Sequence, residues 1–478
     1  MAGLNSDPFA QLPIETNQHI ASFLEYDQDL CSYRLICQST LNAIDADNCS
    51  FWRRRFLTRF EKPSWSGSNA QYKSSYQKRQ NVLKHGAFFK QGRTLEEYKC
   101  LEVLRDLIVE SFSSKPSAED QVYESLNLQT ILKFIVANNF LQSVFQPFRS
   151  TRPQMSIKPL LHTLQILCAP MLLSLEPHIM NHHFGFPDSQ SAVYSCGFKY
   201  PLIAGIDDRT INMDLLLHNV NFWKYHMIRE AEATLFQSFS QLDDDERPRW
   251  WSTQLTQKRQ PLGRHWKGSY AYLSLKEVKA LRQGGSDDQI QDCFAGEDDA
   301  FAFQDMRLDE VEDDQPFPWP PLFERHLQSL KQPTNHAKTR AQRRSTASSS
   351  EDPASPTKAV SFRFNGEGID TSESFLATGW LNPLPPQQGI PGWQRVTMMK
   401  YFADEDTGSI DTEALWAYEG VVLPGGQIML GRWWSVADTD DEMYSGPFIL
   451  WCVDGPKYDA TGEGEEEMDD GPSMVLDG

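Results

Sequence analysis

The sequence predicts an α+β protein, with short N-terminal helices, an all-α middle domain and a C-terminal antiparallel β-barrel or sandwich. Apolar residues recur at helical spacing as far as about residue 245. From about residue 262 they alternate with a period of two, which is typical of strands with one buried face. With 478 residues, 40% hydrophobic and 12% aromatic, the chain is expected to hold about three domains with sizeable cores.

The N-terminal region, residues 12–60, is expected to begin with a helix after a flexible lead-in of residues 1–11. Pro13 can open that helix, because its φ is preset and its nitrogen needs no hydrogen-bond partner in the first turn. Ile20, Phe23 and Leu24 then fall at i, i+3 and i+4. This spacing predicts a helix with one apolar stripe.

Two further short helices are expected before Trp52 closes the region. The second ends near Leu35 and the third covers residues 38–44. Isolated helices shorter than about 12 residues are marginal in water, so these helices need a partner. The Leu12-Pro13 edge is the expected partner-binding surface; the alternative is a helical hairpin packed on the rest of the chain.

The middle domain, residues 70–250, is expected to be all-α and to act as a spacer. Leucines and isoleucines share a helical face in several windows, and prolines divide the region into short helices. The clearest faces are Leu101, Leu104, Leu107 and Ile108, and Leu128, Ile131, Leu132, Ile135 and Val136.

The C-terminal β domain, residues 262–455, is expected to hold several short strands. A glycine-containing turn at residues 424–426 separates two of them, which is typical of a hairpin. Residues 379–386 are expected to form an irregular loop, because their prolines cannot sustain a ladder. The insertion 331–358 and the acidic tail 456–478 lack large apolar clusters and are expected to be disordered. The expected strands cover residues 268–273, 359–364, 393–402, 415–423, 428–434 and 448–453.

Residues 12–56 resemble an F-box, the module that docks on a Skp-family adaptor. The resemblance rests on Leu12-Pro13-Ile14-Glu15, the apolar stripe, Arg34-Leu35-Ile36-Cys37 and the closing Trp52, in that order. Asn17-Gln18-His19 departs from the pattern, where an apolar residue is common. The resemblance implies a three-helix F-box whose adaptor contact is made or held by Leu12, Pro13, Ile20, Leu24, Leu30, Leu35 and Trp52.

Blocks further along the chain are similar to a family of filamentous-fungal F-box proteins. They cover residues 300–308, 379–386, 392–402 and 416–426. The resemblance implies a non-catalytic substrate receptor of a Skp–cullin–F-box ubiquitin ligase, in which a cullin-RING ligase supplies the chemistry and the β domain holds an unknown protein substrate. Two alternatives remain: a scaffold that binds the adaptor without ubiquitylation, and a barrel that binds a small apolar ligand.

Composition bears on the other function classes. A net charge of −20 argues against nucleic-acid binding, which needs a basic stripe. Scattered cysteines without a C-x-x-C pair and the lack of a signal-like N-terminus predict a soluble cytoplasmic or nuclear protein without a membrane segment. His178 and His182 are too few for a structural zinc site, so we expect no metal and no cofactor.

The tryptophans of the β domain are the remaining notable feature. Most are expected to be core, because adjacent Trp433 and Trp434 must face opposite sides of a strand. Tryptophan and arginine are enriched at binding hot spots. Trp380, Arg432 and Trp433 are therefore the candidate substrate-binding residues.

Overall fold

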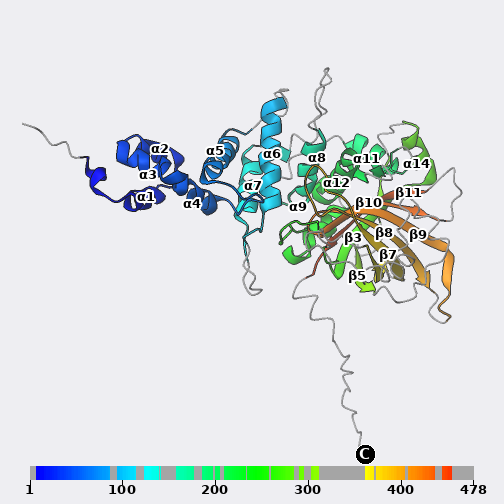
Figure 1. Ribbon diagram of the computed structural model, residues 1–478. Helices are drawn as coiled ribbons and strands as arrows, with labels where there is room; N and C mark the ends of the chain where they lie inside the picture. The colour runs from blue at the N-terminus through cyan, green and yellow to red at the C-terminus, as the bar shows by residue number, and fades with distance from the viewer. Residues whose placement is uncertain are drawn as a thin grey trace, which may run out of the picture.

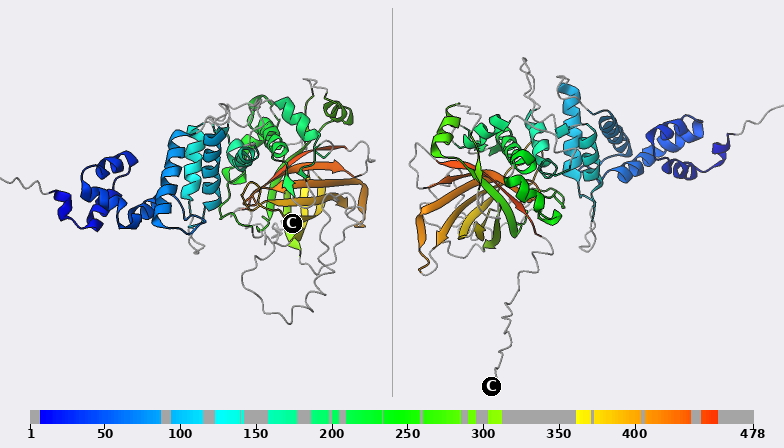
Figure 2. Two further views of the ribbon diagram at one scale, coloured as in Figure 1. Left: turned by 45° about the horizontal axis from the view of Figure 1, so that its top comes forward. Right: turned by 180° about the vertical axis from the view of Figure 1, so that it is seen from behind.

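The chain has a helical end and a barrel end, with further helices between them (Figure 1). In two further views the first helices also lie far from the barrel (Figure 2). The computed structural model describes residues 7–86, 94–114, 123–138, 140–141, 158–176, 186–197, 200–204, 209–232, 234–257, 260–284, 290–294, 303–311, 361–370, 373–403, 407–436 and 444–454. The insertion 331–358 and the tail 456–478 lie outside these residues.

Four α-helices, rather than three, form the N-terminal end. The additional one, α4, contains Trp52 and begins after Asn48 and Cys49, which both have positive φ. Part of the expected lead-in is also helical, since Phe9 in a short 3-10 helix packs edge-on against Tyr33. The elements are η1 Pro8–Gln11, α1 Ile14–Ser22, α2 Asp27–Arg34, α3 Gln38–Asp45, η2 Asp47–Cys49 and α4 Ser50–Arg59.

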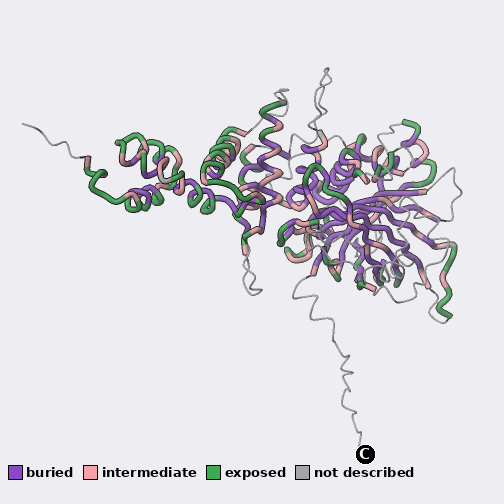
Figure 3. Tube along the Cα trace, in the orientation of Figure 1, coloured by how far each residue is buried: buried purple, intermediate pink, exposed green. Residues whose placement is uncertain are grey.

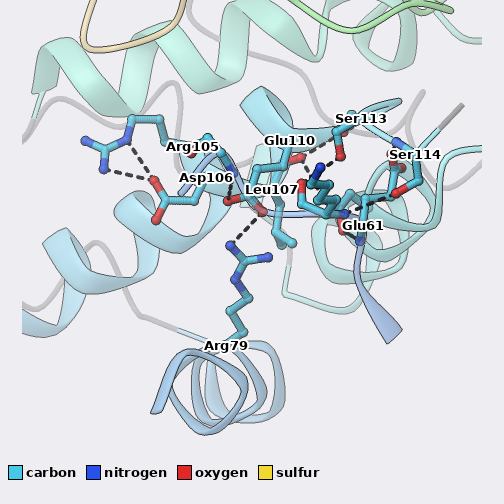
Figure 4. A network of polar contacts seen from close by, with 12 residues as sticks. Glu61, Arg79, Arg105, Asp106, Leu107, Glu110, Ser113 and Ser114 are labelled. Carbon is cyan, nitrogen blue, oxygen red and sulfur yellow. Dashed lines mark hydrogen bonds and ion pairs between the residues drawn. The ribbon is translucent and has the colours of Figure 1, made fainter. Parts of the chain in front are cut away.

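The next helices stand side by side between the two ends. Ser68 caps α5 and Ser125 caps α7 through their hydroxyl oxygens, which accept backbone N–H bonds. The expected apolar faces are largely buried, with Leu101 and Leu107 fully so. A buried polar network also joins this layer to the chain that follows α4 (Figure 4). These helices are α5 Asn69–His85, α6 Thr94–Glu110 and α7 Leu126–Ala137.

The remaining helices lie against the barrel, and α11, α12 and α14 cover the wall that contains β10 and β11. Asn219 on α12 donates to the Gly431 carbonyl at 2.9 Å, and Arg282 on α14 donates to Ser445 Oγ at 2.7 Å. One connected core runs from α1–α4 into this layer and on to Leu430 and Ile449 of the barrel wall. The elements are α8 Lys158–Leu167, α9 Ala169–Leu172, α11 Phe186–Tyr194, α12 Met213–Ile228, η4 Glu230–Glu232, α13 Thr234–Gln241, η5 Asp244–Glu246 and α14 Leu275–Arg282.

Two expectations about the middle domain are therefore corrected. It is not all-α, because β1 Ile203–Ala204 and β2 Thr210–Ile211 form a short antiparallel pair. It is also not only a spacer, because α11 and α12 contact β11 and β10 directly. The apolar outer face of those strands can be buried only by a covering layer, and these helices supply it.

The C-terminal strands form a closed barrel rather than a sandwich. They run antiparallel in the order β3-β5-β6-β7-β8-β9-β10-β11, and β11 pairs back with β3, so these eight strands have no free edge; β4 lies beside β3 outside the ring. The strands are β3 His265–Tyr272, β4 Cys293–Phe294, β5 Gln304–Val311, β6 Phe362–Asp370, β7 Glu373–Pro383, β8 Gln394–Ala403, β9 Ile410–Val422, β10 Ile428–Ser435 and β11 Ser445–Cys452.

The expected irregular loop at residues 379–386 is wrong for residues 379–383, whereas residues 384–386 lie outside any strand or helix. Residues 379–383 belong to β7, which pairs with β6 on one side and β8 on the other. The strand ends at Pro383, so Pro385 and Pro386 fall beyond it and break no ladder. Strand β5 and helix α14 were not expected either.

The barrel interior is filled by side chains from all eight strands. Alternate residues, among them Trp266, Tyr418 and Phe448, form one buried cluster. Gly420 and Gly431 make room for the Phe448 ring, since a Cβ at either position would lie under 3.0 Å from it. The dense purple of the burial tube at this end reflects that packing (Figure 3).

Candidate functional site

The N-terminal end carries an unusual number of exposed apolar side chains. Leu35 is 82% exposed, Phe23 72%, Tyr26 70% and Ile36 57%. Exposed apolar groups gathered in one region of a folded chain typically mark a protein-interaction site. We call the following set the α1–α2 apolar surface: Leu12, Ile20, Phe23, Tyr26, Leu35 and Ile36.

Helix α1 is turned so that polar residues face the core. Asn17 and Gln18 are buried, whereas Ile20 and Phe23 are exposed. The buried Asn17 donates to the Phe9 carbonyl at 3.0 Å, and the Tyr33 hydroxyl donates to the Asn17 carbonyl at 3.2 Å. These bonds offset the loss of hydration of Asn17. The departure from the family pattern at Asn17-Gln18 thus lies on the inner face of α1.

The residues expected to contact the adaptor fall into two groups. Leu12, Pro13, Ile20 and Leu35 are exposed, and Leu24 is half-buried. Leu30 and Trp52 are 2% and 7% exposed, so they lie in the helical core. Trp52 Nε1 also donates to Asp45 at 3.1 Å, which links α4 to α3. The first group can touch a partner, and Leu30 and Trp52 hold the helices that present it.

Arg55 fixes the connection between α1 and α2. It is 6% exposed and donates to the carbonyls of Leu24 and Glu25 at 2.7 and 2.8 Å. It also lies 3.1 Å from the Asp27 carboxylate, which accepts from the Tyr76 hydroxyl at 2.7 Å. Burial raises the pKa of Tyr76 to about 12, so the hydroxyl keeps its proton.

Sequence analysis missed Arg55, since a run of three arginines looks like a solvated helix face. The inward placement of Arg55 follows from helical spacing, because it lies four residues after the buried Phe51 on α4. The result is that the α1–α2 apolar surface is tied to α4 and α5 rather than carried on a loose hairpin.

The structure does not bring the expected substrate-binding residues together. Trp433 points into the barrel, where its Nε1 donates to the Ala271 carbonyl at 3.0 Å. Arg432 and Trp380 face outward. Arg432 lies 3.1 Å from Glu419 and 4.4 Å above the Trp434 ring, and it is therefore held by the barrel wall. A single site containing all three residues is excluded, because neighbours on a strand face opposite sides of a sheet.

A groove of about 570 Å³ lies on the outer wall of the barrel across β3, β5, β6 and β7. Its exposed apolar side chains are Ile369 and Leu376, at 57% and 39%. Its charged lining residues are Glu246, Lys267, Asp305, Arg307 and Glu367. We call it the β3–β7 groove.

Other classes of site find little support within the described parts of the chain. No group of three or more His, Cys, Asp and Glu residues is placed there to hold a metal ion. His178 and His182 lie outside the described residues. The helices that the structure does describe are all too short or too polar to cross a bilayer.

Comparisons with known proteins found no relative of this chain: no protein-family model, curated protein or solved structure matches it.

Proposed function

We propose that this chain is the substrate-receptor subunit of a Skp–cullin–F-box ubiquitin ligase. The observation that carries the proposal is the orientation of α1, with Asn17 and Gln18 inside and Ile20 and Phe23 outside. Exposed apolar side chains are unfavourable in water, and a Skp-family adaptor would bury them. The F-box resemblance of residues 12–56 identifies the class of that partner.

The two ends of the molecule suit a division of roles. The α1–α2 apolar surface lies at one end and the barrel at the other, with α5–α7 between them (Figures 1 and 2). An adaptor seated on the first end leaves the barrel free to hold a protein target. In this role the receptor is non-catalytic and needs no cofactor, and it acts in the cytosol or nucleus.

The first test is co-purification with a Skp-family adaptor. Leu12→Ala with Pro13→Ala, and separately Leu35→Asp, should abolish recovery of the adaptor, because these side chains are exposed and apolar. Leu95→Asp is the matched control, since Leu95 is 67% exposed on α6, away from this surface. All variants should keep the wild-type melting temperature. Unchanged adaptor binding by both surface variants would refute the proposal.

The scaffold alternative is separated by what accompanies the adaptor. Recovery of cullin together with ubiquitylated prey supports the receptor, whereas recovery of the adaptor alone supports the scaffold. The ligand-binding alternative receives less support, because aromatic and aliphatic side chains already fill the barrel interior. Extraction of the purified chain followed by mass spectrometry of small molecules would test it.

A further inference from the structure

We infer that the β3–β7 groove binds a peptide segment of the target that places an aliphatic or aromatic side chain beside a lysine or arginine. The inference rests on the proposed receptor function for its biological role. It adds the chemical class of the target and a location for it. Neither Trp380 nor Arg432 is among the residues that line this groove.

Among the described strand residues of the barrel, the exposed large apolar side chains are Ile369 and Leu376, and both line the groove. On the opposite wall, outward residues such as Leu430 and Ile449 are buried beneath helices. In the groove, Leu376 lies opposite Glu367, and Ile369 lies opposite Ser374, on paired strands β6 and β7. Leu376 and Ile369 are therefore diagonal neighbours, close enough to receive one apolar side chain between them.

The charges of the groove favour a cationic partner. Lys267 is paired with Asp305 at 2.7 Å, and Arg307 is paired with Asp309 at 3.0 Å. Asp309 is shared with Arg264 at 3.2 Å, so each basic side chain of the groove has a carboxylate partner, and the groove lining carries three carboxylates against two cations. Glu367 is exposed and lies opposite Arg307 on the paired strand β5, but Arg307 pairs with Asp309, and Glu367 forms no ion pair with another described residue. A lysine or arginine beside the apolar anchor would meet this carboxylate, and the net charge of −20 favours its approach.

The shape of the groove favours a protein segment over a small molecule. Strands β3, β5, β6 and β7 are each paired on both sides, so a ligand cannot add to the sheet as another strand. The groove must therefore recognise its ligand through side-chain contacts. The floor is also shallow, since Glu367, Ile369 and Leu376 remain exposed. Small-molecule sites usually enclose most of their ligand, whereas a peptide can lie along an open groove.

The test is selection of a random peptide library displayed on phage against the full-length chain. The most enriched peptide is then synthesised with a fluorophore, and its affinity is measured by fluorescence anisotropy. We expect enrichment of an apolar residue flanked by lysine or arginine. Ile369→Asp and Leu376→Asp should each weaken binding about tenfold or more, as expected for an apolar anchor. Glu367→Lys should weaken binding of the same peptide and favour acidic peptides in a fresh selection.

Two matched variants control for non-specific effects. Leu95→Asp and Glu230→Lys change exposed residues of the same types on α6 and η4, and neither residue lines the groove. Both should bind the peptide as the wild type does. All variants are compared by melting temperature, so that loss of fold is distinguished from loss of binding.

The inference is overturned if no shared pattern is enriched, if the pattern is acidic, or if binding survives all three groove variants. Adaptor recovery from the same proteins is scored separately. If the wild-type chain binds the peptide but not the adaptor, the receptor proposal is refuted and the groove proposal stands. If the wild-type chain binds the adaptor and the groove variants bind the peptide as tightly as the wild type, only the groove proposal is refuted.

Discussion

Arg79 and Glu110 form an ion pair that is almost completely buried. Arg79 Nη2 lies 2.7 Å from Glu110 Oε2, and the side chains are 3% and 2% exposed. The pair joins α5 to α6 (Figure 4). The Arg79 guanidinium also lies 4.9 Å from the Phe56 ring of α4. Glu110 accepts a further bond from the Ser64 amide at 3.4 Å. The N-terminal helices are thereby coupled to the layer that leads to the barrel.

Breaking this pair should destabilise the helical end strongly. Removing one partner of a buried pair leaves an uncompensated charge, so Arg79→Ala should cost about 3–5 kcal/mol of unfolding free energy. Arg79→Met with Glu110→Leu should restore much of that loss. Urea denaturation followed by circular dichroism measures both.

Lys78→Ala is the matched control for Arg79→Ala. Lys78 precedes Arg79 on α5 and pairs with Glu102 at 3.2 Å, but its side chain is 46% exposed. A surface pair of this kind contributes only about 0–1 kcal/mol. Equal losses from Lys78→Ala and Arg79→Ala would contradict a special role for the buried pair.

The Tyr33 hydroxyl should be needed for the orientation of α1. Tyr33→Phe removes the donor to Asn17 and leaves buried polar groups of Asn17 without that partner, which should cost about 1–3 kcal/mol. Because α1 presents part of the α1–α2 apolar surface, adaptor affinity should fall as well. Denaturation and a titration with purified adaptor report the two effects. A stability loss at wild-type adaptor affinity would show that Tyr33 supports the fold alone.

Trp433 should be a stability residue of the barrel. It is 3% exposed inside the barrel, so Trp433→Ala should destabilise the chain by about 3–5 kcal/mol through loss of burial and the cavity that remains. Trp380→Ala, on the outer wall, should lower the melting temperature less. Differential scanning calorimetry compares them; a smaller effect at Trp433 would contradict its interior placement.

Trp380 remains a candidate substrate-binding residue on the outer wall, outside the β3–β7 groove. If its outer position belongs to the target site, Trp380→Ala should lose substrate while it retains the adaptor, and capture should weaken as salt rises. A paired pull-down of wild type and Trp380→Ala measures this. Equal prey recovery would remove Trp380 from the site.

His218 should make stability depend on pH. Burial lowers its pKa below the usual 6.5, and Ser189 Oγ lies 3.0 Å from its Nδ1. The unfolded chain therefore takes up a proton below pH 6.5 that the folded chain resists. Stability is full above that pH and falls as the pH drops through it. His218→Asn should flatten the decline in melting temperature between pH 7 and 5.5; an unchanged decline would contradict this.

Local pattern along the chain predicted much of the fold. The spacing around Ile20 predicted the first helix, although α1 ends at Ser22 and leaves Phe23 and Leu24 beyond it. Alternation predicted most of β8–β10, because side-chain periodicity is set by backbone geometry. Strand β5 could have been found in the same way. Its Asp305, Met306, Arg307 and Leu308 alternate between exposed or half-buried and buried positions.

Periodicity says which residues share a face, but not where that face points. Only the tertiary structure shows that Asn17 faces inward and Ile20 outward, because this depends on hydrogen-bond partners such as Tyr33 from another helix. The same holds for the pairing of β11 with β3, which closes the barrel between strands far apart in the sequence. The β3–β7 groove follows from that closure and from the helices that cover the opposite wall. No local sequence window contains those contacts, and so the choice between buried and exposed faces was made by packing.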